Sequence, residues 1–144
     1  MQGVYTTIGF EAAHRLYDVE TYSEECRDNI HGHSYKVMVK VIRRELNSAG
    51  MVIDFKLLKK ILKETIEDKY DHSCIVRDCD PLAKPLQLNC KKVHVVTDNP
   101  TAEWMAKQFA NDIQSALNEV VPQLLVEEVH VQETENNIAV YRLD

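Results

Sequence analysis

The sequence contains no long apolar run and no excess of positive charge. No segment reaches the roughly 18 consecutive apolar residues of a membrane-spanning helix, so we expect no transmembrane segment. The start of the chain, MQGVYTTIGF, lacks the basic stretch followed by an apolar one that is typical of a signal peptide. The net charge of −6 argues against non-specific binding to nucleic acid or to a membrane surface.

Cysteine is scarce, and its spacing excludes common patterns. The four cysteines, Cys26, Cys74, Cys79 and Cys90, contain no C-x-x-C pair, which argues against a purely structural zinc site. We interpret them as reduced thiols of a cytoplasmic protein, and spacing alone leaves a disulfide open. Repeats, low-complexity tracts and linkers are also absent. We therefore interpret residues 1–144 as a single domain, long enough to bury a core.

Alternation of apolar and polar residues predicts four β-strands. The predicted strands are residues 4–15, 31–44, 126–133 and 138–143. The tetrapeptide TENN between the last two is typical of a hairpin turn.

Two segments show the spacing of amphipathic helices. Residues 54–70 repeat apolar side chains at helical intervals and begin at Asp54, which is a suitable N-cap. Residues 99–122 begin with the helix start signal Asn-Pro-Thr.

The remaining segments carry weaker signals. Residues 18–29 are polar and predict a loop, residues 77–92 predict irregular structure, and VHVV at residues 93–96 is a candidate short strand. The order is therefore hairpin, helix, helix, hairpin. It predicts an α+β fold in which a four-stranded antiparallel sheet carries two helices on one face.

Three histidines fall at matching ends of the first two predicted strands. His31 and His33 are two residues apart, so their side chains point the same way, and Gly32 between them lets the backbone bend. His14 ends the apolar row of the preceding strand. If the strands pair, the three imidazoles converge. Three histidines suit Zn²⁺ and leave its fourth position open for catalysis, whereas His-x-His alone would be a weak signal.

Six motifs occur in order along nearly the whole chain: FEAAHRL, C…HGHSYKV, MVIDF, DH, NPTAEWMA and QETENNIAVY. In this order they resemble the 6-pyruvoyltetrahydropterin synthase family, which includes the 6-carboxytetrahydropterin synthases of queuosine biosynthesis. The resemblance implies a T-fold of ββααββ topology. It also implies a homo-oligomer, with trimers that close a barrel and stack as hexamers, and active sites between subunits.

The resemblance implies that His14, His31 and His33 bind zinc and that Cys26 is a catalytic base. The family places this cysteine six or four residues before the first histidine, as C-x5-H-G-H or C-x3-H-G-H, whereas Cys26 gives C-x4-H-G-H. Another branch uses a glutamate three residues before that histidine, where this chain has Asp28. A thiolate near a cation is a competent base. Cys26 is therefore favoured, and Asp28 stays the alternative.

The resemblance also assigns a second acid/base pair and a pterin anchor. Asp71 and His72 match the family's Asp-His pair, which enters from a neighbouring subunit, although alone they would describe a surface turn. The Glu133 carboxylate can accept two hydrogen bonds from the 2-amino group and N3 of a pterin, and Thr134 is a further contact. Glu103 is explained as a favourable charge in the first turn of a helix.

The implied reaction is a lyase reaction on 7,8-dihydroneopterin triphosphate, with zinc as cofactor and with the pyruvoyl and carboxy product branches both open. Arg15 and Lys36 are candidates to offset the charge of this substrate. Two other classes stay open. One is a non-catalytic T-fold protein that binds zinc and a pterin or purine, and the other is an unrelated zinc hydrolase with three histidines.

Overall fold

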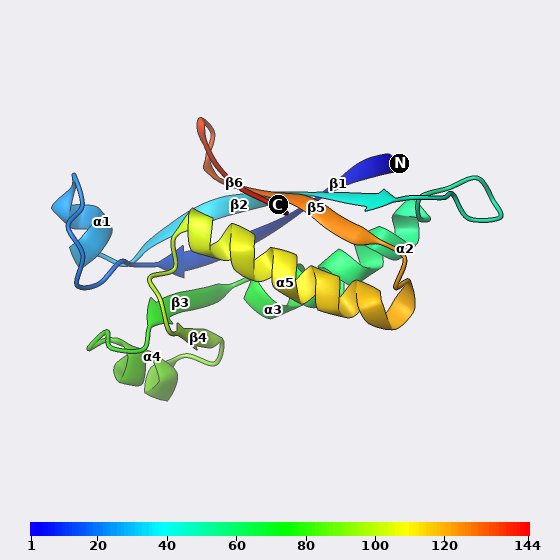
Figure 1. Ribbon diagram of the computed structural model, residues 1–144. Coiled ribbons are helices and arrows are strands. Elements are labelled where there is room, and N and C mark those ends of the chain that lie inside the picture. The colour runs from blue at the N-terminus through cyan, green and yellow to red at the C-terminus, as the bar shows by residue number, and fades with distance from the viewer.

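A six-stranded sheet forms one layer of the molecule, and the longer helices cover one of its faces (Figure 1). The computed structural model describes residues 1–144. The strands are β1 (Gln2–His14), β2 (His31–Arg43), β3 (Ser73–Arg77), β4 (Val93–Val96), β5 (Leu125–Thr134) and β6 (Asn137–Arg142). The helices are α1 (Glu24–Asp28), α2 (Phe55–Leu62), the π-helical turn η1 (Lys63–Glu67), α3 (Asp68–Tyr70), α4 (Ala83–Asn89) and α5 (Ala102–Val120).

The four strands expected from alternation lie side by side in the sheet. Its spatial order is β4-β3-β1-β2-β5-β6, and the pairs β1–β2, β2–β5 and β5–β6 are all antiparallel. Helices α2 and α5 pack on the same side (Figure 1). The α+β class and the hairpin, helix, helix, hairpin order are therefore confirmed.

The expected count of four strands is wrong, because β3 and β4 extend the sheet beyond β1. β3 is parallel to β1, and β4 is parallel to β3. β3 consists of Ser73–Arg77, which is short and has no regular alternation on which a strand prediction could rest. The candidate strand VHVV is confirmed as β4.

Two segments that we expected to be without regular structure contain short helices. The predicted loop at residues 18–29 includes α1, and the predicted irregular segment at residues 77–92 includes α4. α4 accommodates Pro85 because that residue lies in its first turn, where no intrahelical hydrogen bond is lost.

The two predicted helices form, the first with its expected cap, Asp54, and the second with Thr101 of the Asn-Pro-Thr start signal as its cap. The Asp54 carboxylate accepts hydrogen bonds from the backbone at Lys56 and Leu57, and the Thr101 hydroxyl accepts one from Trp104. The helix that starts at α2 runs through η1 into α3, so the π-helical turn lies inside it. No helix of the chain is long and apolar enough to cross a membrane.

The pairing of β1 with β2 sets up both the core and the site. Phe10 lies opposite Tyr35, and their stacked rings have centroids 4.8 Å apart in the core under α5. The same register places His14 opposite His31 at the end of the hairpin. The histidines therefore continue the core-facing rows of both strands.

Candidate active site

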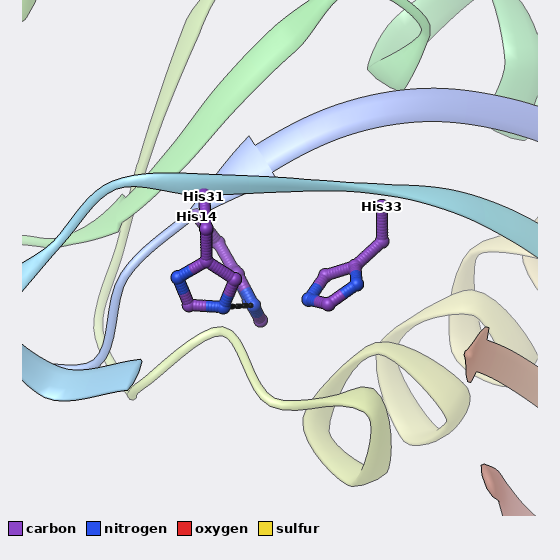
Figure 2. Close-up of side chains that lie close together, drawn as sticks. All are labelled: His14, His31 and His33. Atoms are coloured by element: carbon purple, nitrogen blue, oxygen red, sulfur yellow. Dashed lines mark hydrogen bonds between the residues drawn. The ribbon is translucent and has the colours of Figure 1, made fainter. Parts of the chain in front are cut away.

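The three histidines converge on the helix-covered side of the sheet (Figure 2). His14 comes from the last position of β1, and His31 and His33 come from the start of β2. One ring nitrogen from each residue lies within 4.8 Å of the others. The structure thus brings together all three histidines that the sequence singled out.

Backbone carbonyls fix the tautomers of two of these rings. His14 donates its Nδ1 proton to the Pro100 carbonyl at 2.7 Å, and His31 donates its Nδ1 proton to the Asn29 carbonyl at 2.9 Å. A neutral imidazole that donates from Nδ1 carries a lone pair on Nε2. The two Nε2 atoms nevertheless lie only 3.0 Å apart. The Nε2 atom of His33 is buried and has no hydrogen-bond partner.

Burial favours the neutral, metal-binding form of two rings, those of His14 and His33. His14 is only 3% exposed, and burial lowers its pKa to about 4, against the opposing effect of the Pro100 carbonyl. Burial also lowers the pKa of His33. Metal ligation requires neutral imidazole. Two facing lone pairs and one buried nitrogen without a partner therefore form a donor set that a metal ion such as Zn²⁺ fits.

Glu133 lies beside the histidine cluster. Its Oε1 atom is 3.5 Å from His14 Nε2 and 3.7 Å from His33 Nε2. Glu133 also lines a cavity of about 540 Å³ between the start of α5 and the β5–β6 hairpin. Thr134 does not line this cavity, and its hydroxyl accepts a hydrogen bond from the Asn137 side chain at 2.8 Å.

A second carboxylate, Glu103, lines the same cavity. The sequence had explained it as a first-turn charge, and it does lie in the first turn of α5. The position of Glu103 inside the family motif NPTAEWMA was the sequence signal that could have identified it as a site residue. The cavity therefore has one carboxylate on β5 and another on α5.

Cys26 is exposed on helix α1. The alternative base, Asp28, has its carboxylate bound by the Arg27 guanidinium at 2.9 and 3.2 Å. These hydrogen bonds lower the pKa of the Asp28 carboxyl. A carboxylate of lowered pKa is a weaker base, so this contact favours Cys26 over Asp28.

Asp71 and His72 form a hydrogen-bonded pair. His72 Nδ1 lies 2.8 Å from Asp71 Oδ2, and the Glu11 backbone N–H donates to Asp71 Oδ1 at 2.8 Å. These two contacts, the Glu11 bond first, lower the pKa of Asp71 and keep it a carboxylate. His72 has a positive φ of 60°, held by a hydrogen bond from its N–H to the Glu11 carbonyl. The Asp-His pair is thus built into the end of the helix that precedes β3.

Asp71 and His72 do not line the cavity of Glu133 in their own chain. His72 has an 81% exposed side chain and lines a separate cavity of about 320 Å³. That cavity is also lined by Glu11, Gly32 and Ser34, which alternate with the histidines along their strands and so belong to the opposite face of the sheet. His33 of the cluster lines it as well.

Neither of the two candidate cations, Arg15 and Lys36, offers a free positive charge to a substrate in the Glu133 cavity. Arg15 forms two hydrogen bonds to the Asp80 carboxylate, so its charge is already compensated. Lys36 is exposed and alternates with the core-facing residues Tyr35 and Val37, so it lies on the other face of the sheet. The expectation that these side chains offset a polyanionic substrate finds no support in their positions.

The sequence profile described as 6-pyruvoyl tetrahydropterin synthase matches residues 3–144. The chain belongs to this family. A 6-carboxy-5,6,7,8-tetrahydropterin synthase from Rickettsia conorii is 33% identical over 108 residues, which cover 74% of this chain and 75% of that protein. The human 6-pyruvoyl tetrahydrobiopterin synthase is 32% identical and covers 94% of this chain, with 87% of its own length matched.

A solved structure of the family agrees with the fold. The 6-pyruvoyl tetrahydropterin synthase of Caenorhabditis elegans superposes with a TM-score of 0.72 at 27% identity, and the match covers 99% of this chain and 96% of that one. The T-fold expected from the motifs is therefore confirmed.

Proposed function

We propose that this protein is a zinc-dependent lyase that acts on 7,8-dihydroneopterin triphosphate. The observation that carries the proposal is the convergence of three imidazole nitrogens beside a carboxylate and a cavity, with a lowered pKa at buried His14 and at half-buried His33. The names of the related proteins, a 6-carboxy-5,6,7,8-tetrahydropterin synthase and a 6-pyruvoyl tetrahydrobiopterin synthase, support pterin chemistry.

We assign the metal to His14, His31 and His33. When bound there, zinc would polarise the side-chain hydroxyls of the substrate and acidify the protons that are lost as the triphosphate leaves. The carbonyls of Pro100 and Asn29 orient two of the rings through their Nδ1 protons. Such partners of metal-binding histidines raise ligand basicity and fix ring orientation.

The pterin ring binds in the cavity between α5 and the β5–β6 hairpin. Glu133 is the anchor, since its carboxylate can accept two parallel hydrogen bonds from the 2-amino group and ring N3. It lies within 4 Å of two histidines, so a pterin held there would present its side chain to the metal. Glu103 on α5 is a second acceptor in the cavity. Thr134 supports the hairpin side of the cavity through its hydrogen bond with the lining residue Asn137.

Cys26 is the base that removes protons from the substrate side chain. Its thiol is exposed on α1, the helix that lies in the chain between β1 and β2, the two strands that carry the histidines. A thiolate close to a cation is well matched to proton transfer at neutral pH. Asp28 is the weaker candidate, because Arg27 already holds its carboxylate.

The second acid/base pair, Asp71 and His72, acts in the site of a neighbouring subunit. Its exposed imidazole and its separate cavity suit a group that faces another chain. The Asp71 carboxylate orients the ring. This arrangement requires a homo-oligomer, which we propose is a trimer or a pair of stacked trimers.

One experiment tests the function and decides the product. Purified protein is incubated with 7,8-dihydroneopterin triphosphate, and the products are identified by mass. A pyruvoyl side chain indicates triphosphate elimination with isomerisation. A carboxyl group together with released acetaldehyde indicates the carboxy branch. Unchanged substrate with zinc-loaded, folded protein contradicts the lyase and favours a protein that only binds the pterin.

A further inference from the structure

Helix α1 carries Cys26 but is weakly attached to the rest of the molecule. None of its residues is buried. Two hydrogen bonds join it to the end of β1: the Leu16 N–H donates to the Cys26 carbonyl at 3.3 Å, and Arg15 Nη1 donates to the Asp28 carbonyl at 3.2 Å. Short exposed elements with few contacts open at low free-energy cost. The position of Cys26 therefore depends on these two residues.

Arg15 is itself held firmly from the other side. Its Nε and Nη2 atoms donate to the two carboxylate oxygens of Asp80 at 2.7 and 2.5 Å. The Asp80 side chain is 0% exposed, and it also accepts a hydrogen bond from the Leu82 N–H at 2.8 Å. A bidentate pair of this kind fixes the guanidinium plane as well as its charge.

We propose that the Arg15–Asp80 pair positions Cys26 for catalysis by holding helix α1 against the end of β1. The inference rests on the proposed role of Cys26 as base. Arg15 directly follows the proposed metal ligand His14 in the chain. A fixed Arg15 therefore keeps the helix that carries Cys26 in a constant position relative to the metal site. The geometry needs arginine, because one guanidinium must donate to Asp80 with two nitrogens and to the Asp28 carbonyl with a third.

The alternative is that the pair stabilises the fold and nothing more. A buried ion pair that loses one partner leaves an uncompensated charge, which lowers stability wherever the pair lies. The two explanations predict changes in different parts of the molecule. Positioning predicts a change confined to α1 and to turnover, whereas general stabilisation predicts a change throughout the sheet.

The test uses Arg15→Lys and Asp80→Asn in the full-length, zinc-loaded protein. Lysine keeps the charge beside Asp80 but cannot make all three contacts. Asp68→Asn is the matched control, because it removes the Lys63–Asp68 pair on the surface far along the chain. Amide hydrogen exchange is followed at Leu16, which donates to Cys26, and along β2. Steady-state kcat and KM are measured alongside.

We expect exchange at Leu16 and in α1 to quicken about tenfold in Arg15→Lys, with β2 and zinc content unchanged. We expect kcat to fall about tenfold and KM to change less than twofold. The control should match the unaltered protein. Unchanged exchange in α1 would overturn the inference, as would equally raised exchange in β2 or an unaltered kcat despite a loosened α1.

The same data separate this inference from the proposed function. If the unaltered protein has no activity on the pterin triphosphate, the lyase proposal fails. The exchange at Leu16 then still shows whether Arg15 holds the helix. If Asp80→Asn does not fold, Arg15→Lys carries the test alone, because its charge still compensates the buried Asp80.

Discussion

The Nε2 atoms of His14 and His31 lie 3.0 Å apart while both rings donate their Nδ1 protons to backbone carbonyls. The lone pairs on the two Nε2 atoms then face each other. At this distance they repel unless a proton or a metal cation is shared between them. The low pKa of His14 disfavours the proton at neutral pH. The arrangement is therefore suited to a metal ion, and His33 offers a third nitrogen within reach.

Removing one histidine should empty the metal site. The purified protein should carry close to one zinc per chain, and His31→Ala should lose it, since two ligands hold zinc poorly. His130→Ala is the control, because His130 pairs with Glu128 and lies outside the cluster. Elemental analysis that finds full zinc in His31→Ala would refute the assignment.

The metal-free protein should lose stability in mild acid. The pKa of His14 falls from 6.5 to about 4 on folding, so between these values the unfolded chain binds more protons than the folded one. Stability is thus fully present above about pH 6.5 and declines as the pH falls through 4. At roughly 1.4 kcal/mol per pH unit, the loss is about 3 kcal/mol.

Urea unfolding of the metal-free protein at several pH values measures this loss. His14→Asn provides the control, since an asparagine has no proton to gain in this range. A free energy of unfolding that stays flat between pH 6.5 and 4.5 would show that the buried imidazole is not neutral as described.

Glu133→Gln should weaken pterin binding with little change in zinc content. The amide keeps the shape but replaces one acceptor with a donor, so one of two hydrogen bonds to the pterin becomes a clash. The loss is about 1.5–3 kcal/mol, or tenfold and more in affinity. A parallel titration of Glu103→Gln compares the two carboxylates of the cavity. If only the Glu103 variant binds more weakly, the anchor is Glu103 and not Glu133.

Cys26→Ala should lower turnover far more than Asp28→Asn. Loss of a general base costs about 10²–10⁴-fold, and zinc should be retained in both variants. Asp28→Asn should cost much less, because Arg27 already occupies its carboxylate. Single-turnover assays rank the two. The reverse order would assign the base to Asp28 and place this enzyme nearer the branch that uses a glutamate.

Two inactive variants should restore activity when they assemble together. If Asp71 and His72 serve a neighbouring subunit, a mixed oligomer of Cys26→Ala and His72→Ala contains some sites with both groups intact, about a quarter of them at equal mixing. The variants are unfolded and refolded together, then assayed. Activity no higher than that of either variant alone would place the pair and the cysteine in the same chain. An active monomer in sedimentation would lead to the same conclusion.

Local periodicity in the sequence determined much of the fold. The long strands alternate because one face packs on helices, and this alternation gave β1, β2, β5 and β6. The cap Asp54 lies within three residues of the N–H groups from which it accepts hydrogen bonds, so short-range spacing revealed it. The Asn-Pro-Thr signal marked the start of α5, and the structure identifies Thr101 as its cap. The convergence of His14 with His31 followed from the same period, because each ends the core-facing row of its strand.

Contacts between distant residues were decided only by the tertiary structure. β3 and β4 are parallel strands, whose pairing needs a crossover and leaves no local alternation. Glu133 reaches His14 only because β5 pairs with β2, which is a register that no short segment encodes. The exposure of the His72 side chain depends on the positive φ of this residue and on the hydrogen bond from its N–H to the carbonyl of Glu11, sixty-one residues earlier in the sequence.

The contact between Arg15 and Asp80 shows the same division. Sequence reasoning treated Arg15 as a free charge near the site, whereas the fold buries a carboxylate from 65 residues further along the chain against it. Period and capping depend on neighbours within a turn or two of the chain, so one sequence reveals them. Which charge meets which partner depends on how the sheet is ordered and closed, and that is set by the packing of the whole core.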